Sequence, residues 1–194
     1  MDRISFLRGP VTPDDEGLND ERQLLLDFIP FTPFGVSEAD ARRLKAILDP
    51  DIRVFGRFDG VPMKQLLYLF DEGLIDGAVI GAAAEKDLYR LAETFSKPLY
   101  LSVRSLLGDD LKRAERLPVD GLCFRAIPPE GYLKQRKKSC LLRLSAQKTP
   151  FEDWDKKSMD LLNEKGGIIL QCRERILFDR AKAILTAQDP SFTP

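Results

Sequence analysis

The clearest structural signal in the chain lies in residues 53–103, which read RVFGRFDGVPMKQLLYLFDEGLIDGAVIGAAAEKDLYRLAETFSKPLYLSV. Three short apolar runs alternate here with two amphipathic stretches; the runs are 53–58, 77–82 and 98–103, and the stretches are 62–72 and 85–95. Short runs that are continuously apolar are typical of strands covered on both faces, as in parallel sheets. This alternation predicts right-handed β-α-β units.

The same alternation extends toward both ends of the chain. Further apolar runs lie at 4–7, 24–31, 121–127, 140–144 and 167–172, and further helical patterns lie at 37–48, 109–117, 155–163 and 178–187. Eight candidate strands favour a closed barrel over an open sheet, so we predict an α/β fold, a (β/α)8 TIM-type barrel formed by residues 1–194 as one domain. No clear helix separates 121–127 from 140–144. Residues 128–150 fit a long loop, a hairpin or a strand, which leaves open an irregular or incomplete C-terminal third.

The composition excludes several classes of protein. The 194 residues carry a formal net charge of -1, which gives no reason to expect nucleic acid or an anionic membrane as a partner. Three irregularly spaced cysteines argue against a disulfide framework. No apolar stretch approaches the length of a transmembrane helix, and the first eight residues are too short and too polar for a signal peptide. We therefore expect a cytoplasmic protein.

The chain contains no histidine. This absence excludes Ser-His-Asp and Cys-His nucleophile systems and every metal site that needs histidine. Any proton transfer must use Asp, Glu, Lys, Cys or Tyr side chains. We expect no metal site and no cofactor.

Several stretches, in order along the chain, resemble phosphoribosylanthranilate isomerase, the barrel enzyme of tryptophan biosynthesis. Residues 26–44, LDFIPFTPFGVSEADARRL, are similar to the family's second strand, its Ser-Pro-Arg loop and the next helix. Residues 53–103 resemble strands three to five, residues 118–124 the sixth strand, and residues 151–154 the Phe-Asp-Trp that opens the sixth helix. The likeness covers most of residues 3–185, and it implies a barrel isomerase of a phosphorylated aminosugar.

The resemblance also implies that the family's catalytic residues are replaced. The family uses a cysteine general base at the end of strand one and an aspartate general acid at the end of strand six. Arg8 and Arg125 stand at those positions, and Phe34 stands where the Ser-Pro-Arg loop has its arginine. Val79-Ile-Gly-Ala82 and Leu170-Gln-Cys-Arg173 replace a Gln-Leu-His-Gly motif and a glycine-rich phosphate loop. Arginine does not exchange protons near neutrality, so we expect no isomerase activity.

Arginines gather at the predicted carboxyl ends of the strands: Arg8, Arg57, Arg104, Arg125, Arg143 and Arg173. These ends converge on one face of a barrel, and guanidinium groups suit bidentate contacts to phosphate. We predict an anion site that uses Arg8, Arg125, Arg57, Arg104 and Arg173. The alternative is that some of them point outward and pair with carboxylates of the flanking segments: Asp59, Glu85, Asp87, Asp109, Asp110, Glu130 and Glu174.

Two further groups of charged residues complete the candidates. Asp59, Glu85 and Asp87 follow the third and fourth predicted strands and are the nearby carboxylates for acid–base chemistry. Lys134, Arg136, Lys137 and Lys138 form a basic run that we interpret as a solvated loop, because nucleic-acid contacts need interleaved aromatic residues.

Three functional hypotheses follow. The first is a phosphoribosylanthranilate isomerase-like barrel without isomerase activity that binds a small anionic or phosphorylated ligand. The second is an active isomerase, or another sugar-phosphate enzyme, with displaced catalytic groups such as Asp59 or Glu85. The third is a scaffold or dimerisation module, and a homodimer is compatible with all three.

Overall fold

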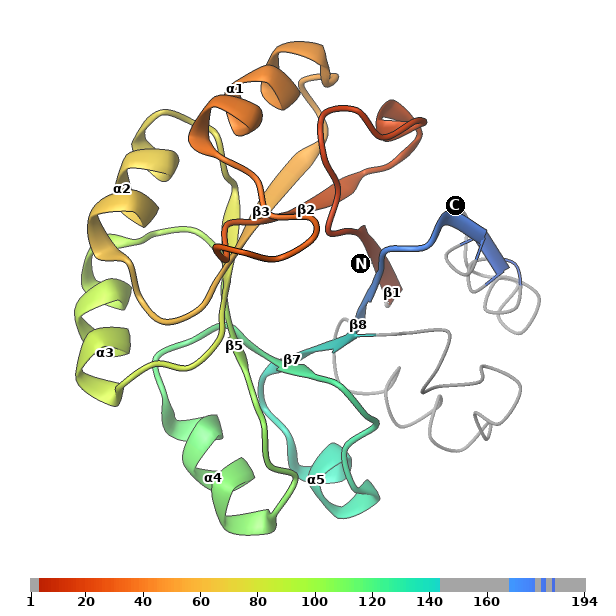
Figure 1. The fold of residues 1–194 in the computed structure, drawn as a ribbon. Helices are drawn as coiled ribbons and strands as arrows, with labels where there is room; N and C mark the ends of the chain where they lie inside the picture. The colour runs from red at the N-terminus through yellow and green to blue at the C-terminus, as the bar shows by residue number, and fades with distance from the viewer. Residues whose placement is uncertain (1–3, 144–167, 177–178, 181–182, 184–194) are drawn as a thin grey trace.

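Eight parallel strands form a closed barrel in the order β1 to β8, surrounded by a layer of helices (Figure 1). The computed structural model describes residues 4–143, 168–176, 179–180 and 183. The strands are β1 Ile4–Arg8, β2 Gln23–Asp27, β3 Arg53–Phe58, β4 Gly77–Ile80, β5 Leu99–Ser102, β6 Gly121–Phe124, β7 Ser139–Arg143 and β8 Ile168–Cys172. The helices are η1 Leu18–Asp20, α1 Glu38–Ile47, α2 Met63–Asp71, α3 Glu85–Thr94, α4 Gly108–Arg116 and α5 Glu130–Gln135.

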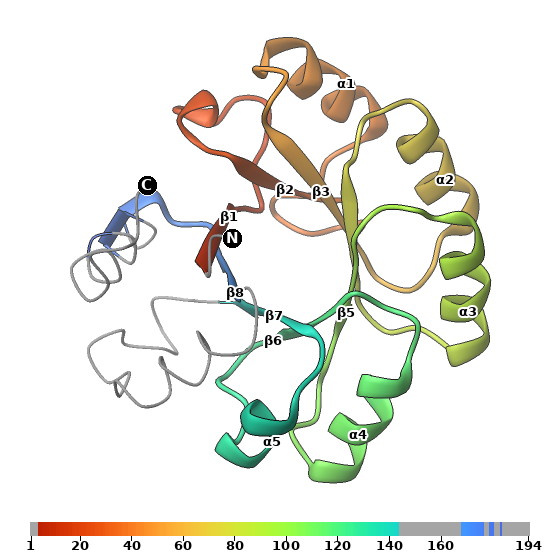
Figure 2. The same ribbon diagram turned by 180° about the vertical axis from the view of Figure 1, so that it is seen from behind.

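The predicted barrel is confirmed, and the C-terminal third completes it. β8 pairs with β7 on one side and with β1 on the other, where Ile4 lies beside Ile168 and Arg8 beside Cys172. β7 is therefore a barrel strand, which resolves the open choice for residues 128–150. The sequence predicts no clear helix before this strand, and that prediction is wrong: α5 occupies Glu130–Gln135 (Figure 2). With six residues, α5 is too short to show a clear helical period.

Local sequence signals explain where the elements begin. Ser37 caps α1, because its side chain accepts from the Asp40 amide while the Asp40 side chain accepts from the Ser37 amide. Asp76 and Asp120 precede β4 and β6, and their carboxylates accept hydrogen bonds from the amides of Val54 at 2.9 Å and Leu99 at 2.8 Å. These carboxylates attach the start of each strand to its neighbour at the amino end of the barrel.

The interior of the barrel is filled by one side chain from each strand. This layer consists of Leu7, Leu25, Phe55, Val79, Tyr100, Cys123, Leu141 and Ile169. Gly77 and Gly121 make room for it, because a Cβ at either position would collide with the ring of Phe55 or Tyr100. The alternate residues of the strands face outward and form a second core with the helices. The barrel is thus sealed by apolar side chains.

Two predicted helices fall wholly or largely outside the described residues. The helical pattern at 155–163 lies there, as does the motif at 151–154. Of the pattern at 178–187, only 179–180 and 183 are described, and they are helical. Within the part of the chain that the structure describes, no helix combines the length and apolar character needed to span a bilayer.

Candidate anion site at the carboxyl end of the barrel

The residues that face the barrel interior just above the apolar layer are polar or glycine. Because side chains alternate along a strand, these residues lie two positions beyond the members of that layer. They are Gly9, Asp27, Arg57, Gly81, Ser102, Arg125, Arg143 and Gln171. We call this set the mouth layer. It lies at the carboxyl ends of the strands, where barrel proteins place their sites.

Asp27 and Arg57 form a buried ion pair across neighbouring strands. Their Cα atoms are register partners of β2 and β3. Arg57 Nε donates to Asp27 Oδ1 at 3.2 Å and Arg57 Nη2 donates to Asp27 Oδ2, so the contact is bidentate. The Asp27 side chain is fully buried and that of Arg57 is 13% exposed. The third nitrogen, Arg57 Nη1, is buried and has no hydrogen-bond partner among the described residues.

Arg125 and Arg143 add two more positive charges to this pair. Burial lowers the pKa of Arg143, and the guanidinium groups of Arg57 and Arg125 lower it further, while Asp27 acts in the opposite direction. Among the described residues, the one ion pair that involves any of these three arginines is Arg57–Asp27. Three guanidinium charges and one carboxylate leave two positive charges in the mouth layer. An anion bound there would relieve their mutual repulsion.

Cys123 lies directly below these arginines. Burial raises the pKa of its thiol, although a hydrogen bond with Ser102 and the charges of Arg143, Arg57 and Arg125 favour the thiolate. Desolvation is the largest of these effects, so the thiol is kept neutral.

The structure separates the other predicted arginines from this group. Leu7 faces the barrel interior, so Arg8 faces outward, where its Nη1 donates to the Gly17 carbonyl oxygen at 3.0 Å. Arg104 is exposed beyond the end of β5. Arg173 is exposed and lies over the ring of Phe34, with 3.1 Å between its Cζ and the ring centroid. Arg125 is exposed as well, but its charge acts on both Arg143 and Cys123. Of the five predicted residues, Arg57 and Arg125 therefore lie near each other, together with Arg143.

The carboxylate that pairs with Arg57 is that of Asp27, which is not among the carboxylates predicted from the sequence. Asp27 lies inside the apolar run 24–31, and that run predicts a buried strand rather than a site residue. A single carboxylate embedded in such a run was the signal that could have revealed it. Three of the proposed outward partners instead bind helix residues, in the pairs Glu85–Arg113, Asp109–Lys112 and Glu130–Lys134. Asp59 is exposed.

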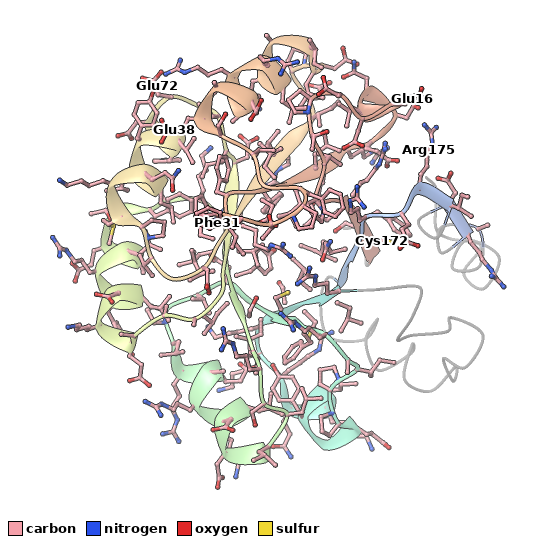
Figure 3. The ribbon with its side chains drawn as sticks, viewed as in Figure 1. Glu16, Phe31, Glu38, Glu72, Cys172 and Arg175 are labelled. Carbon is pink, nitrogen blue, oxygen red and sulfur yellow. The ribbon has the colours of Figure 1, made fainter. Side chains whose placement is uncertain are left out.

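Asp27 also organises the loop that follows β2. Its carboxylate accepts from the amide of Ile29 at 3.1 Å and from Thr32 Oγ1 at 3.2 Å. Its carbonyl oxygen accepts from the Val36 amide at 2.8 Å. The loop presents Phe31 fully exposed, with a left-handed φ of 62° (Figure 3). One buried carboxylate therefore fixes both the orientation of Arg57 and the loop beside it.

Across the described residues, no group of three or more Cys, Asp or Glu side chains is arranged to hold a metal ion. The site is built from permanent cations, which repel metal ions and attract anions.

These features define a β/α barrel with a cationic carboxyl end. Among solved structures, the fold is that of phosphoribosylanthranilate isomerase. The enzyme from Thermus thermophilus matches with a TM-score of 0.64 and 14% identity, over 94% of this chain and 99% of that one. A phosphoribosylanthranilate isomerase in complex with reduced 1-(o-carboxyphenylamino)-1-deoxyribulose 5-phosphate matches with a TM-score of 0.64 and 15% identity. The match covers 88% of this chain and 87% of that one.

A protein of another name matches as well. FabK from Thermotoga maritima matches with a TM-score of 0.54 and 13% identity, over 88% of this chain and 58% of that one. No protein-family model and no curated protein sequence matches the chain. The likeness is thus one of fold, and the function must be argued from the site.

Proposed function

We propose that this chain is a phosphoribosylanthranilate isomerase-like barrel that binds a small anionic or phosphorylated ligand at its carboxyl end and does not catalyse the isomerisation. The observation that carries the proposal is the meeting of Arg57, Arg125 and Arg143 around one buried carboxylate. The buried and unpaired Nη1 of Arg57 is a donor that an anion would satisfy. A neighbour of the same fold holds a phosphorylated ligand, which agrees with this choice.

The absence of isomerase activity follows from the side chains at the two positions that the resemblance singles out. At the end of β1 the interior-facing residues are Leu7 and Gly9, and Arg8 faces outward. At the end of β6 the corresponding residue is Arg125. None of these groups exchanges a proton near neutral pH. A one-residue shift of the alignment on β1 therefore restores no acid or base.

A second candidate function rests on the presence of Asp27 and Cys123 near the same mouth. A carboxylate and a thiol are the groups that the isomerisation needs, so an active enzyme with displaced catalytic residues is the alternative. Two observations count against it. Asp27 is fully buried and bound by Arg57, and burial raises the pKa of Cys123.

Anion binding is tested by calorimetry and thermal shift with inorganic phosphate, sulfate and ribose 5-phosphate. A ligand that binds only the native state stabilises it by about 2.7 kcal/mol when the free ligand concentration is about 100 times the Kd. The variant Arg125→Ala should weaken phosphate binding at least tenfold without unfolding the protein. Arg90→Ala, an exposed arginine on α3, is the matched control and should leave the affinity unchanged. Equal affinities for the wild type and Arg125→Ala would remove the basis of the site assignment.

The catalytic part is tested with the purified chain and N-(5'-phosphoribosyl)anthranilate, and by complementation of a tryptophan auxotroph. We expect neither turnover nor growth. Turnover that disappears in both Asp27→Asn and Cys123→Ser would establish the displaced-residue enzyme instead.

A further inference from the structure

A second candidate binding surface lies on the outside of the barrel, away from the mouth. α4 and α5 are neighbours in the helix layer (Figure 1), and a hollow of about 450 Å³ lies between them. It is lined by Gly108, Leu111, Lys112, Glu115, Arg116, Gly131, Tyr132, Gln135 and Lys137. We call it the α4–α5 groove. α5 spans six residues and α4 spans nine, so the shorter helix leaves part of α4 uncovered.

The floor of the groove is held rigidly. The ring of Tyr132 packs edge-on against Phe124 with centroids 5.7 Å apart, and its hydroxyl donates to Glu115 Oε1 at 2.6 Å. The Lys137 amide donates to Glu115 Oε2 at 3.4 Å. Both carboxylate oxygens of Glu115 are therefore engaged by the protein itself, and Glu115 is the one acidic residue of the lining.

The rim of the groove is cationic. Lys112, Arg116 and Lys137 are all exposed, and within the described part of the chain Lys112 has one ion-pair contact, with Asp109 at the long distance of 3.8 Å. A second hollow of about 530 Å³ between α3 and α4 shares Lys112 and Arg116 with the groove. The aliphatic parts of these long side chains add apolar surface beside the partly buried ring of Tyr132, while their charged ends stay in water.

The structure also revises the interpretation of the basic run 134–138. Arg136 is buried and its Nη1 donates to the Lys138 carbonyl oxygen at 3.3 Å. Lys138 turns inward and donates to the carbonyl oxygen of Val119, while Lys134 binds Glu130. The run is therefore not a uniformly solvated loop: two of its cations hold the end of α5 in place, and Lys137 is presented at the groove.

We propose that the α4–α5 groove docks an acidic amphipathic segment of a partner protein, with an apolar side chain on the partly buried ring of Tyr132 and carboxylates against Lys112, Arg116 and Lys137. Charge complementarity selects this occupant, since three cations face one carboxylate that is already engaged. The geometry is that of helix-in-groove recognition, in which apolar anchors enter a hollow and a charged rim sets the partner.

Two glycines of the lining permit a test that leaves the fold intact. A Cβ at Gly131 or Gly108 would meet no atom within 4 Å. Gly131→Trp should therefore fill the groove without disturbing the packing, and Gly131→Ala is the matched control that adds a methyl group only. Lys112→Glu combined with Arg116→Glu reverses the charge of the rim. All variants should melt within a few degrees of the wild type, because these positions are exposed.

The experiment pans a random dodecapeptide display library on the purified chain, with counter-selection on Gly131→Trp. We expect enriched peptides that combine Asp or Glu with Leu, Ile or Phe. Their Kd, measured by fluorescence anisotropy, should rise at least tenfold in Gly131→Trp and in the charge-reversed variant. The Kd should change less than twofold in Gly131→Ala and in Arg125→Ala. An unchanged Kd in Arg125→Ala would show that the peptides do not bind at the mouth.

Several results would overturn the proposal. They are the absence of enrichment, a basic consensus, and binding that is equal in Gly131→Trp. A wild-type dimer that Gly131→Trp dissociates in light scattering would make a second copy of the chain the occupant. Retention of RNA that depends on Lys112 and Arg116 would make the occupant a nucleic acid.

Discussion

The Asp27–Arg57 pair provides the sharpest test of how the mouth is built. Asp27→Asn keeps the shape of the side chain but removes the charge that balances a guanidinium group only 13% exposed. Removing one partner of a buried ion pair costs about 3–5 kcal/mol, because the other charge stays buried. For a chain of this size, that loss corresponds to a fall in Tm of roughly 6–20 °C. Since domains are stable by about 5–15 kcal/mol, the variant should remain folded but marginal.

The assay is chemical denaturation followed by circular dichroism, which gives the free energy of unfolding for each variant. Asp59→Asn is the control, because this exposed carboxylate also follows a strand and should contribute less than about 0.5 kcal/mol. The double variant Asp27→Asn with Arg57→Gln should regain part of the loss, because the buried guanidinium charge that Asp27 balances is then removed as well. Phosphate should stabilise Asp27→Asn more than the wild type, since the uncompensated charge of the mouth rises from two to three. A destabilisation below about 1 kcal/mol, or additive effects in the double variant, would refute this reasoning.

Three further predictions concern other parts of the chain. Ser37→Ala should lower the free energy of unfolding by about 1 kcal/mol through loss of the α1 cap. Hydrogen bonds from Ser37 hold the pKa of Asp40 below its ordinary value of 3.8. The stability that the ionised Asp40 carboxylate adds to this cap should therefore be present above pH 4 and disappear on acidification, as pH-dependent denaturation can show. Phe31→Gly should raise stability by about 1 kcal/mol in the same assay, because the φ of 62° strains every residue except glycine and the ring is fully exposed. The three buried cysteines should react with Ellman's reagent at pH 8 only on unfolding, since burial raises the pKa of each thiol, to about 11 for two of them.

The fold could be predicted from the sequence because each strand is a compact apolar run and most helices are amphipathic over two or more turns. The exception shows the limit of this approach. α5 has six residues and one buried side chain, Leu133, so its hydrophobic period is too short to detect. The sequence therefore does not decide between a loop and a strand for the segment that follows α5, although Cys140, Leu141 and Leu142 are all buried in the barrel.

The candidate site could be predicted only in part. The chain carries an arginine at six strand ends, but an end position does not say which way the side chain faces. The direction depends on which alternate residues of the strand face the barrel interior, and a shift of one residue along the strand reverses it. Arg8 and Arg125 illustrate this. Arg8 ends β1 and Arg125 follows β6, yet Arg8 faces away from the barrel interior, toward the Gly17 carbonyl oxygen, and Arg125 faces the mouth.

The apolar layer explains why the charges of the mouth favour an anion rather than a rearrangement of the protein. Side chains from all eight strands seal the barrel beneath Arg57, Arg125 and Arg143, so their charge can be balanced only from the carboxyl end. Asp27, the carboxylate of the mouth layer, is already bound by Arg57, and it also holds the loop that follows β2. A ligand would therefore meet the exposed Arg125, which follows β6, and two guanidinium groups set on strands, those of Arg57 and Arg143, which need little reorganisation on binding. Two uncompensated charges match a phosphate monoester, which is largely a dianion at neutral pH. Sulfate and inorganic phosphate should accordingly bind more tightly than chloride. Equal stabilisation by all three anions at matched ionic strength would indicate general charge screening instead of a specific anion site.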